Sequence, residues 1–326
     1  MNEKKRLEGD YETSLNIIHS DERGTYVLDK PRQGVNPMIS VYADNIPSAW
    51  ELAMLSCWDY GTRVGTHYDT KKDTPKSKEG SICVKISNPF NEPRIHKNFP
   101  GGPEELESYR QEVVNGIHDN WIDPQAGKWT YTYHERLTNW NPYENEEELR
   151  KGGKRILKKG INQINEILCE LNNDITSKAA QMITWYPTAD PKTSKDRPCL
   201  QRLWFRPLED NDGYLLNLNS HWRSRDLGKA WFMNVYAITD WQREIANQLQ
   251  ERIGKPVRVG SYTDISDSLH IYGDYFEDFK KEFERMRNPN LEKRVWNSNH
   301  PAFQMMTEEA KRKLKEDPDW YKKGRG

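Results

Sequence analysis

The chain has 326 residues, a length that suits one large domain or two smaller ones. Its 49 basic and 50 acidic side chains nearly cancel, which argues against a general attraction to nucleic acid or to an anionic membrane. The mean hydropathy is −1.02, no apolar run has membrane-spanning length, and the first residues lead into no signal-peptide core. Twelve tryptophans and 16 tyrosines still supply large side chains for a core.

The four cysteines lack the C-x-x-C spacing and the histidine pattern of a zinc site. This predicts reduced thiols in a cytoplasmic protein without a bound metal. Residue type alone favours a buried, inert thiol at each position, namely Cys57, Cys83, Cys169 and Cys199. Cys199 differs because it follows Pro198 and opens the apolar run CLQRLWF.

The first part of the chain contains one clear helix. Residues 1–35 are polar and charged and predict a loosely held N-terminal arm. Residues 46–61 predict a mostly buried helix with a proline in its first turn and a glycine at its end. Glu51 is the only acid among its apolar residues, so it lies either in water at the helix edge or inside for a specific reason. A charged loop is expected over residues 66–81.

Two further helices are expected in the middle of the chain. Residues 99–121 read as a Gly/Pro loop followed by a helix. Residues 155–173 show apolar side chains at three- and four-residue steps, which predicts one amphipathic helix. The apolar positions are Ile156, Leu157, Ile161, Ile164, Ile167, Leu168 and Leu171.

From residue 181 the pattern changes to strands. Residues 181–187 form one short β-type run, and residues 199–207 and 214–222 predict a hairpin joined by an EDNDG turn. A long helix is expected over 230–254, then strand and loop over 256–273, then charged helical fragments. Without a repeat or a linker, the pattern predicts a single α+β domain.

Four features of the second half occur in a fixed order. They are Cys199 after a proline, the RSRD run at 223–226, Asn234 eleven residues after Arg223, and the HIY run at 270–272. Each is weak alone, because a Cys and a His somewhere in one chain are common.

Together these features resemble the thymidylate synthase and pyrimidine-nucleotide hydroxymethylase family. The family's Pro-Cys loop, RSxD motif, base-reading asparagine and HxY motif fit this order. Upstream, residues 177–185 are similar to its SRR segment, residues 131–137 to its YxYGxRL segment, and WELAML to its glutamate-bearing helix. The resemblance covers about residues 45–280. It implies a large mixed β-sheet flanked by helices over residues 36–284, with residues 285–326 as a charged C-terminal extension.

The resemblance also implies a reaction and its catalytic residues. A one-carbon unit would pass from 5,10-methylenetetrahydrofolate to C5 of a pyrimidine nucleoside monophosphate in a homodimer. Cys199 would add to C6 as a thiolate and so activate C5. Glu51 would organise water and move protons. Tyr133 would position groups near the adduct. Asp226, the acid of the family's RSxD motif, would be catalytic as well. Asp226 could instead be an ion-pair partner of a neighbouring arginine.

The binding residues follow in the same way. Arg223 and Ser224 would bind the phosphate, for which the planar guanidinium fork is well suited. Asn234 would read the N3 and O4 edge of uracil, because its amide offers both a donor and an acceptor. His270 and Tyr272, two apart on a strand, would bind the sugar 3′-OH. As buried residue types, Cys199, His270 and Tyr133 could also be purely structural.

The chain departs from the family pattern at several positions. The SRR segment, whose arginines reach the partner's phosphate, is here Ser177-Lys178-Ala179, so Lys178 keeps only one charge and no fork. Arg32 and Arg202 are candidate replacements. Trp222 stands where the family has glutamine, and the chain ends DWYKKGRG instead of in a short apolar terminus.

These departures bear on which reaction is completed. A synthase moves hydride onto the new methylene group and excludes water, whereas a hydroxymethylase admits water. Asn234 favours uracil and therefore a thymidylate synthase acting on dUMP. A CMP, dCMP or dUMP hydroxymethylase is the alternative, and an inactive nucleotide-binding regulator is a third reading.

Overall fold

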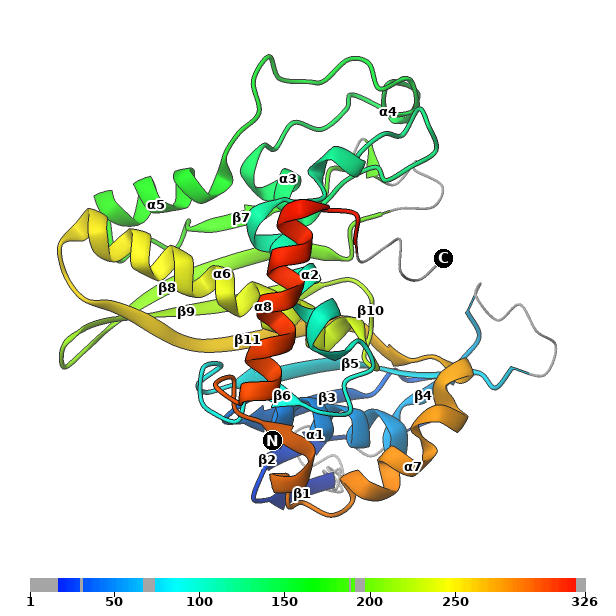
Figure 1. The fold of residues 1–326 in the computed structure, drawn as a ribbon. Helices are drawn as coiled ribbons and strands as arrows, with labels where there is room; N and C mark the ends of the chain where they lie inside the picture. Colours follow the sequence, from blue (N-terminus) through cyan, green and yellow to red (C-terminus); the bar gives the residue numbers. More distant parts are fainter. Residues whose placement is uncertain (1–16, 30–31, 67–73, 188, 191–196, 321–326) are drawn as a thin grey trace, which may run out of the picture.

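The computed structural model describes residues 17–29, 32–66, 74–187, 189–190 and 197–320. The expected α+β fold is present: a large mixed sheet is flanked by helices (Figure 1). The helices are α1 (Ile46–Tyr60), α2 (Gly102–Asn115), η2 (Asp119–Trp121), α3 (Tyr133–Thr138), α4 (Glu146–Lys151), α5 (Gln163–Asn173), α6 (Ala230–Ile253), η4 (Gly273–Tyr275), α7 (Phe276–Met286), η5 (Glu292–Arg294) and α8 (Pro301–Glu316). The strands are β1 (Ile17–Asp21), β2 (Gly24–Leu28), β3 (Met38–Ala43), β4 (Thr62–Val64), β5 (Ser77–Ile86), β6 (Ile95–His96), β7 (Gln181–Ile183), β8 (Leu200–Asp210), β9 (Gly213–Trp222), β10 (Arg225–Asp226), β11 (Val257–Ile271) and β12 (Val295–Trp296).

The main sheet has the strand order β1-β2-β3-β5-β11-β9-β8-β7, with β4 paired to β5 and β10 paired to β11. The predicted hairpin is confirmed, because β8 and β9 are antiparallel and Asp210 lies opposite Gly213 at the turn. β11 runs parallel to β9 and antiparallel to β5, which makes the sheet mixed. The long strand β11 therefore joins the two halves of the chain.

The two faces of the sheet differ in burial. On one face Val84, Leu218 and Tyr262 are buried, and α1 and α6 pack there. The alternating side chains of the other face, such as Ile265 and Trp204, are only half-buried. Strand periodicity thus puts the core between the sheet and the helices.

Both ends of the described chain join the fold. Residues 17–28, which lie in the predicted polar arm, form the β1–β2 hairpin at the sheet edge. In the C-terminal extension, β12 pairs with β6, and α8 packs against α2 (Figure 1).

The prediction of one helix over residues 155–173 was wrong in its first half. Helix α5 begins only at Gln163, after Asn162, whose side chain accepts the N–H of Asn165 as an N-cap. Ile156 and Ile161 are exposed. Gly160 approaches the Asn139 side chain so closely that a Cβ would not fit. The apolar spacing therefore continued by chance through a loop.

Within the described ranges, none of the helices combines the length and apolar character needed to cross a bilayer.

Candidate active site

Cys199 lies directly before β8 and is half-buried. The backbone N–H of Arg223 donates to the Cys199 carbonyl at 2.9 Å, so the end of β9 fixes the cysteine's backbone. The Tyr133 phenol oxygen accepts the N–H of Leu200 at 3.3 Å. Burial, and then the nearby Cys199 thiol, raise the pKa of Tyr133 well above its usual range, so the phenol keeps its proton.

Arg223 holds the loop that carries the thiol. Its Nε donates to the Pro198 carbonyl at 3.1 Å and its Nη2 to the Arg197 carbonyl at 2.9 Å. A guanidinium group therefore lies beside the loop of Cys199, where a cation favours a thiolate. Ser224 follows, half-buried, on the same segment.

Asp226 and His270 are neighbours on adjacent strands. Strand β10 is parallel to β11, with Asp226 opposite His270. The Asp226 carboxylate accepts backbone N–H groups of Gly228, Lys229 and Ala230, so it caps the start of α6. Among the residues that the structure describes, it forms no ion pair with an arginine. Burial outweighs these three bonds and raises the pKa of Asp226.

His270 presents a buried ring nitrogen. The side chain is 6% exposed, and its Nδ1 lies 3.3 Å from the Ser268 carbonyl. Its Nε2 is buried and has no hydrogen-bond partner among the described residues. Burial lowers the pKa of His270, which favours neutral imidazole. Tyr272 packs edge-on against the ring at 4.5 Å, so both HxY side chains are adjacent, as predicted.

Asn234 lies on α6 and is 6% exposed. Its Nδ2 donates to the phenol oxygen of Tyr109 on α2. Burial raises the pKa of Tyr109 well above its usual range, and the neighbouring Tyr133 phenol adds to this effect. Tyr109 therefore joins Asn234 to the neighbourhood of Tyr133. No sequence pattern indicates this contact, because helix periodicity does not show which tyrosine meets an amide.

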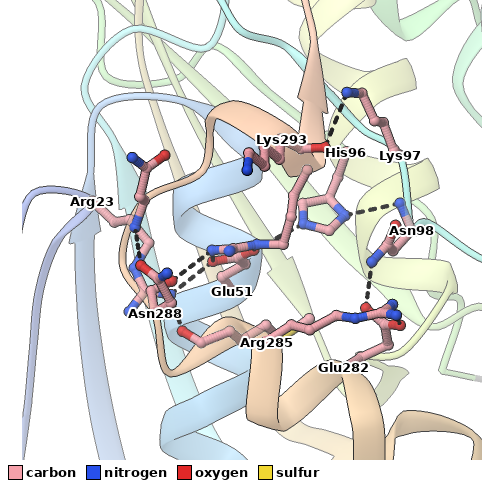
Figure 2. Close-up of polar contacts among 12 residues, drawn as sticks. Arg23, Glu51, His96, Lys97, Asn98, Glu282, Arg285, Asn288 and Lys293 are labelled. Carbon is pink, nitrogen blue, oxygen red and sulfur yellow. Dashed lines mark hydrogen bonds and ion pairs between the residues drawn. The ribbon is translucent and has the colours of Figure 1, made fainter.

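Glu51 is fully buried and has other partners. Arg23 Nη1 donates to Oε2 at 2.7 Å, and Arg294 donates through Nε to Oε1 at 2.6 Å and through Nη2 to Oε2 at 2.9 Å. His96 Nε2 donates to Oε1 at 2.9 Å, because its Nδ1 accepts the N–H of Asn98. Figure 2 shows Arg23 and His96 around this carboxylate. These bonds outweigh burial and hold the pKa of Glu51 below its ordinary value.

The structure therefore groups most predicted residues but not all. Tyr133 and Arg223 both hydrogen-bond to the segment around Cys199, at Leu200 and Pro198, and Asp226 and His270 lie on the next strands. Glu51 touches none of these through the hydrogen bonds described above. Its helix reaches them indirectly, since Trp50 Nε1 donates to the carbonyl of Leu227 at 2.8 Å.

The basic candidates of the phosphate site lie elsewhere on the surface. Lys178 is exposed just before β7, and its carbonyl accepts the indole N–H of Trp204. Arg202 is exposed on β8, and Arg32 is exposed before β3. Within this chain, none of the three is tied to the Cys199 loop by a hydrogen bond that the structure describes.

Comparison with known proteins decides the family. The family model described as thymidylate synthase matches residues 101–311. The chain belongs to the thymidylate synthase family. Similar archaeal proteins bear the name "Putative thymidylate synthase". The one from Methanosarcina acetivorans is 27% identical over 232 residues, covering 71% of this chain and 88% of the relative. The one from Methanocaldococcus jannaschii is 29% identical over 252 residues, covering 76% and 96%.

The family match contains the Cys199, Arg223, Asn234 and His270 positions and extends beyond residue 285 through most of α8. The predicted C-terminal extension is thus partly family sequence. Glu51 precedes the matched range.

Proposed function

We propose that this protein transfers a one-carbon unit to C5 of a pyrimidine nucleoside monophosphate in the cytoplasm, converting dUMP to dTMP. The observation that carries the proposal is the setting of Cys199. The thiol is half-buried, the Tyr133 phenol accepts the N–H of the next residue, and the Arg223 guanidinium donates to the carbonyl of the residue before it. Family membership supports the same chemistry.

The thiol of Cys199 starts the reaction. A bond forms between Sγ and C6, and the C5=C6 electron pair moves to O4, so that C5 becomes nucleophilic. C5 would then bond to the one-carbon unit and lose its hydrogen as a proton, and the bond from that unit to its folate nitrogen would break. Hydride then completes a methyl group as the C6–S bond breaks and returns the thiolate. When bound, 5,10-methylenetetrahydrofolate supplies the carbon and the hydride.

The neighbouring residues take the roles implied by the family. Arg223 and Ser224 bind the phosphate. Lys178, which lies away from the Cys199 loop of its own chain, adds a charge across the homodimer. The orphan Nε2 of His270 fits a sugar hydroxyl, with Tyr272 beside it. Asn234 reads the base edge while Tyr109 holds its amide.

Three acid–base groups complete the proposed catalytic set. Tyr133 stays protonated and positions the adduct, and Asp226, with a raised pKa, faces the start of α6. Glu51 carries protons only if it exchanges its present partners for water, so its role needs a separate test.

A cavity beside α6 fits the folate. It has a volume of about 430 Å³ and is lined by Gly228, Lys229, Tyr275, Phe279 and Asp278, among others. Aromatic walls suit a flat heterocyclic ring, and carboxylates suit its N–H groups. These residues would hold the pterin end next to the Asp226 cap.

The open face of the sheet supports a homodimer. Ser40, Cys83, Ile265 and His221 form a row across β3, β5, β11 and β9 and are only half-buried in one chain. A second copy packed on this face would bury them.

One observation favours hydroxymethylation as a second candidate. The segment after α8 is tied to the η2 region: His118 Nε2 lies 2.9 Å from the Pro318 carbonyl, and Trp121 donates to Asp319. A segment anchored in this way is less free to close over a cofactor and exclude water.

Product mass separates these readings. The protein is incubated with 5,10-methylenetetrahydrofolate and dUMP, dCMP or CMP. A gain of CH₂ on dUMP is expected. A gain of CH₂O identifies a hydroxymethylase. Nucleotide binding without any product identifies the inactive regulator and contradicts the proposal. Cys199→Ala must abolish turnover, and Cys169→Ala, at an exposed thiol, must not.

A further inference from the structure

Arg225, the unassigned third residue of the RSRD run, is buried with spare donors. It is 3% exposed. Its Nη2 donates to Asp264 and, at 2.9 Å, to Ser266 Oγ. Its Nε and Nη1 are buried and have no hydrogen-bond partner among the described residues. A buried charged N–H without an acceptor is costly and rare, so these two groups call for a partner that the described part of the chain does not supply.

Asp264 cannot be that partner, because its two oxygens are already in use. Besides Arg225, Oδ1 receives the indole N–H of Trp231 at 3.2 Å. Oδ2 receives Tyr262 at 2.8 Å and Ser220 at 3.2 Å. The pair with Asp264 therefore fixes the guanidinium in place and leaves Nε and Nη1 available.

The guanidinium lies between the two halves of the candidate site. It packs 4.1 Å from the ring centroid of Trp222, and that ring meets Tyr133 edge-on at 5.7 Å, on the Cys199 side. Its charge also acts on the phenol of Tyr109, which holds Asn234. A base that spans from Cys199 to Asn234 would pass alongside it.

We propose that Arg225 recognises the C4 carbonyl of a uracil base, directly or through one water, and selects uracil over cytosine. This inference rests on the proposed function. When Sγ adds to C6, the electron pair gathers on O4, and a fixed guanidinium stabilises that oxyanion. Cytosine carries an amino group at C4, so the N–H donors of Arg225 would face another N–H donor. These donors would then stay unpaired, which disfavours cytosine.

Three variants separate base recognition from a structural role. Arg225→Lys keeps a cation for Asp264 but lacks the rigid fork. The double variant Arg225→Met/Asp264→Asn removes the charge pair together, which avoids a lone buried charge. Ser266→Ala is the control, because it removes a bond to Nη2 and leaves Nε and Nη1 unchanged.

The readout is release of tritium from [5-³H]dUMP and [5-³H]dCMP with 5,10-methylenetetrahydrofolate, together with the Kd for dUMP by calorimetry. For both Arg225 variants we expect the dUMP rate to fall roughly 100-fold or more, the usual effect of losing an oxyanion donor. The Kd should change less, and the dUMP-to-dCMP rate ratio should fall toward one. Ser266→Ala should retain both the rate and the ratio.

Two results overturn the inference. One is a folded Arg225 variant that keeps the wild-type rate and ratio. The other is a wild-type preference for dCMP. This result would contradict uracil selection even if no variant folds, and it would still agree with the proposed C5 transfer. Absence of tritium release from either nucleotide with wild-type protein instead contradicts the proposed function itself.

Discussion

The sulfur atoms of Cys57 and Cys199 lie in different surroundings. Cys57 Sγ is buried and points at the carbonyls of Lys78 and Leu269, at 3.5 and 3.8 Å. Burial raises the pKa of Cys57 to about 12, so this thiol stays protonated at neutral pH. Cys199 is half-buried beside an arginine-held loop. In the sequence, only the motif order distinguishes Cys199 from Cys57.

This contrast predicts selective alkylation. Iodoacetamide at pH 7.5 should modify Cys199 and leave Cys57 unmodified in the folded protein, because alkylation requires an accessible thiolate. Saturating dUMP should protect Cys199 but not the exposed Cys169. Peptide mass spectrometry measures both effects. Protection that is equal at the two positions would contradict a nucleotide site at Cys199.

The buried ion pairs of Glu51 predict that this residue stabilises the fold. Glu51→Gln removes the buried counter-charge of Arg294 and leaves Arg23 with Asp21 alone, which should lower the free energy of unfolding by about 3–5 kcal/mol. Urea denaturation measures this, with Glu147→Gln, at an exposed ion pair, as a control that should show no measurable change. Wild-type stability combined with a large loss of kcat would show instead that Glu51 is free to act as a proton carrier.

The same residue predicts a pH dependence. The pKa of Glu51 in the folded chain is below its ordinary value of 4.5. Its contribution is therefore fully present above about pH 4.5 and is lost as the pH falls through the lower, folded value. Denaturation curves at falling pH should show less acid sensitivity in Glu51→Gln than in the wild type. Identical pH profiles would contradict the ion-pair account.

At the scale of elements, local signals identified some boundaries and missed others. α6 ends at Gly254 with a φ of 66°, as the glycine predicted, and the β8–β9 turn follows its EDNDG sequence. The predicted helix began too early, at residue 155 instead of at Gln163. The sequence does not distinguish Asn162 from other polar residues, and only the structure shows that its side chain accepts the N–H of Asn165. Arg225 and Tyr109 were missed for a related reason, since their partners lie on distant segments.

The start of α6 depends on Asp226. Asp226→Ala removes the acceptor for three backbone N–H groups and should cost about 1–2 kcal/mol of stability. Asp226→Asn keeps an acceptor oxygen and should cost less. Urea denaturation compares the two. An equal loss in both variants would show that the charge, and not the cap, stabilises this turn.

At the scale of the whole molecule, pattern predicted the α+β class but not the strand order. β11 pairs with β5, which lies far earlier in the chain, and no local signal specifies such a partner. The β12–β6 pair was hidden for the same reason, because Val295 pairs with His96 from a distant segment. The β1–β2 hairpin was missed because its two short strands stand in an otherwise polar and charged stretch.

The open sheet face predicts the oligomeric state. Ile265→Arg places a charge in the centre of that face and should convert a homodimer into monomers. Ile18→Arg, at a side chain 65% exposed on β1, is the control and should stay dimeric. Sedimentation velocity measures both. A wild-type monomer, or a dimer unaffected by Ile265→Arg, would contradict this interface.

The central claim is that Cys199 attacks C6 of a pyrimidine nucleotide. It is tested most directly by intact-protein mass spectrometry after incubation with 5-fluoro-dUMP and 5,10-methylenetetrahydrofolate, because fluorine at C5 prevents the proton loss that completes turnover. The account predicts a stable adduct whose mass includes both compounds, located on the Cys199 peptide and absent in Cys199→Ala. A wild-type protein that forms no adduct with 5-fluoro-dUMP or with 5-fluoro-dCMP would contradict it.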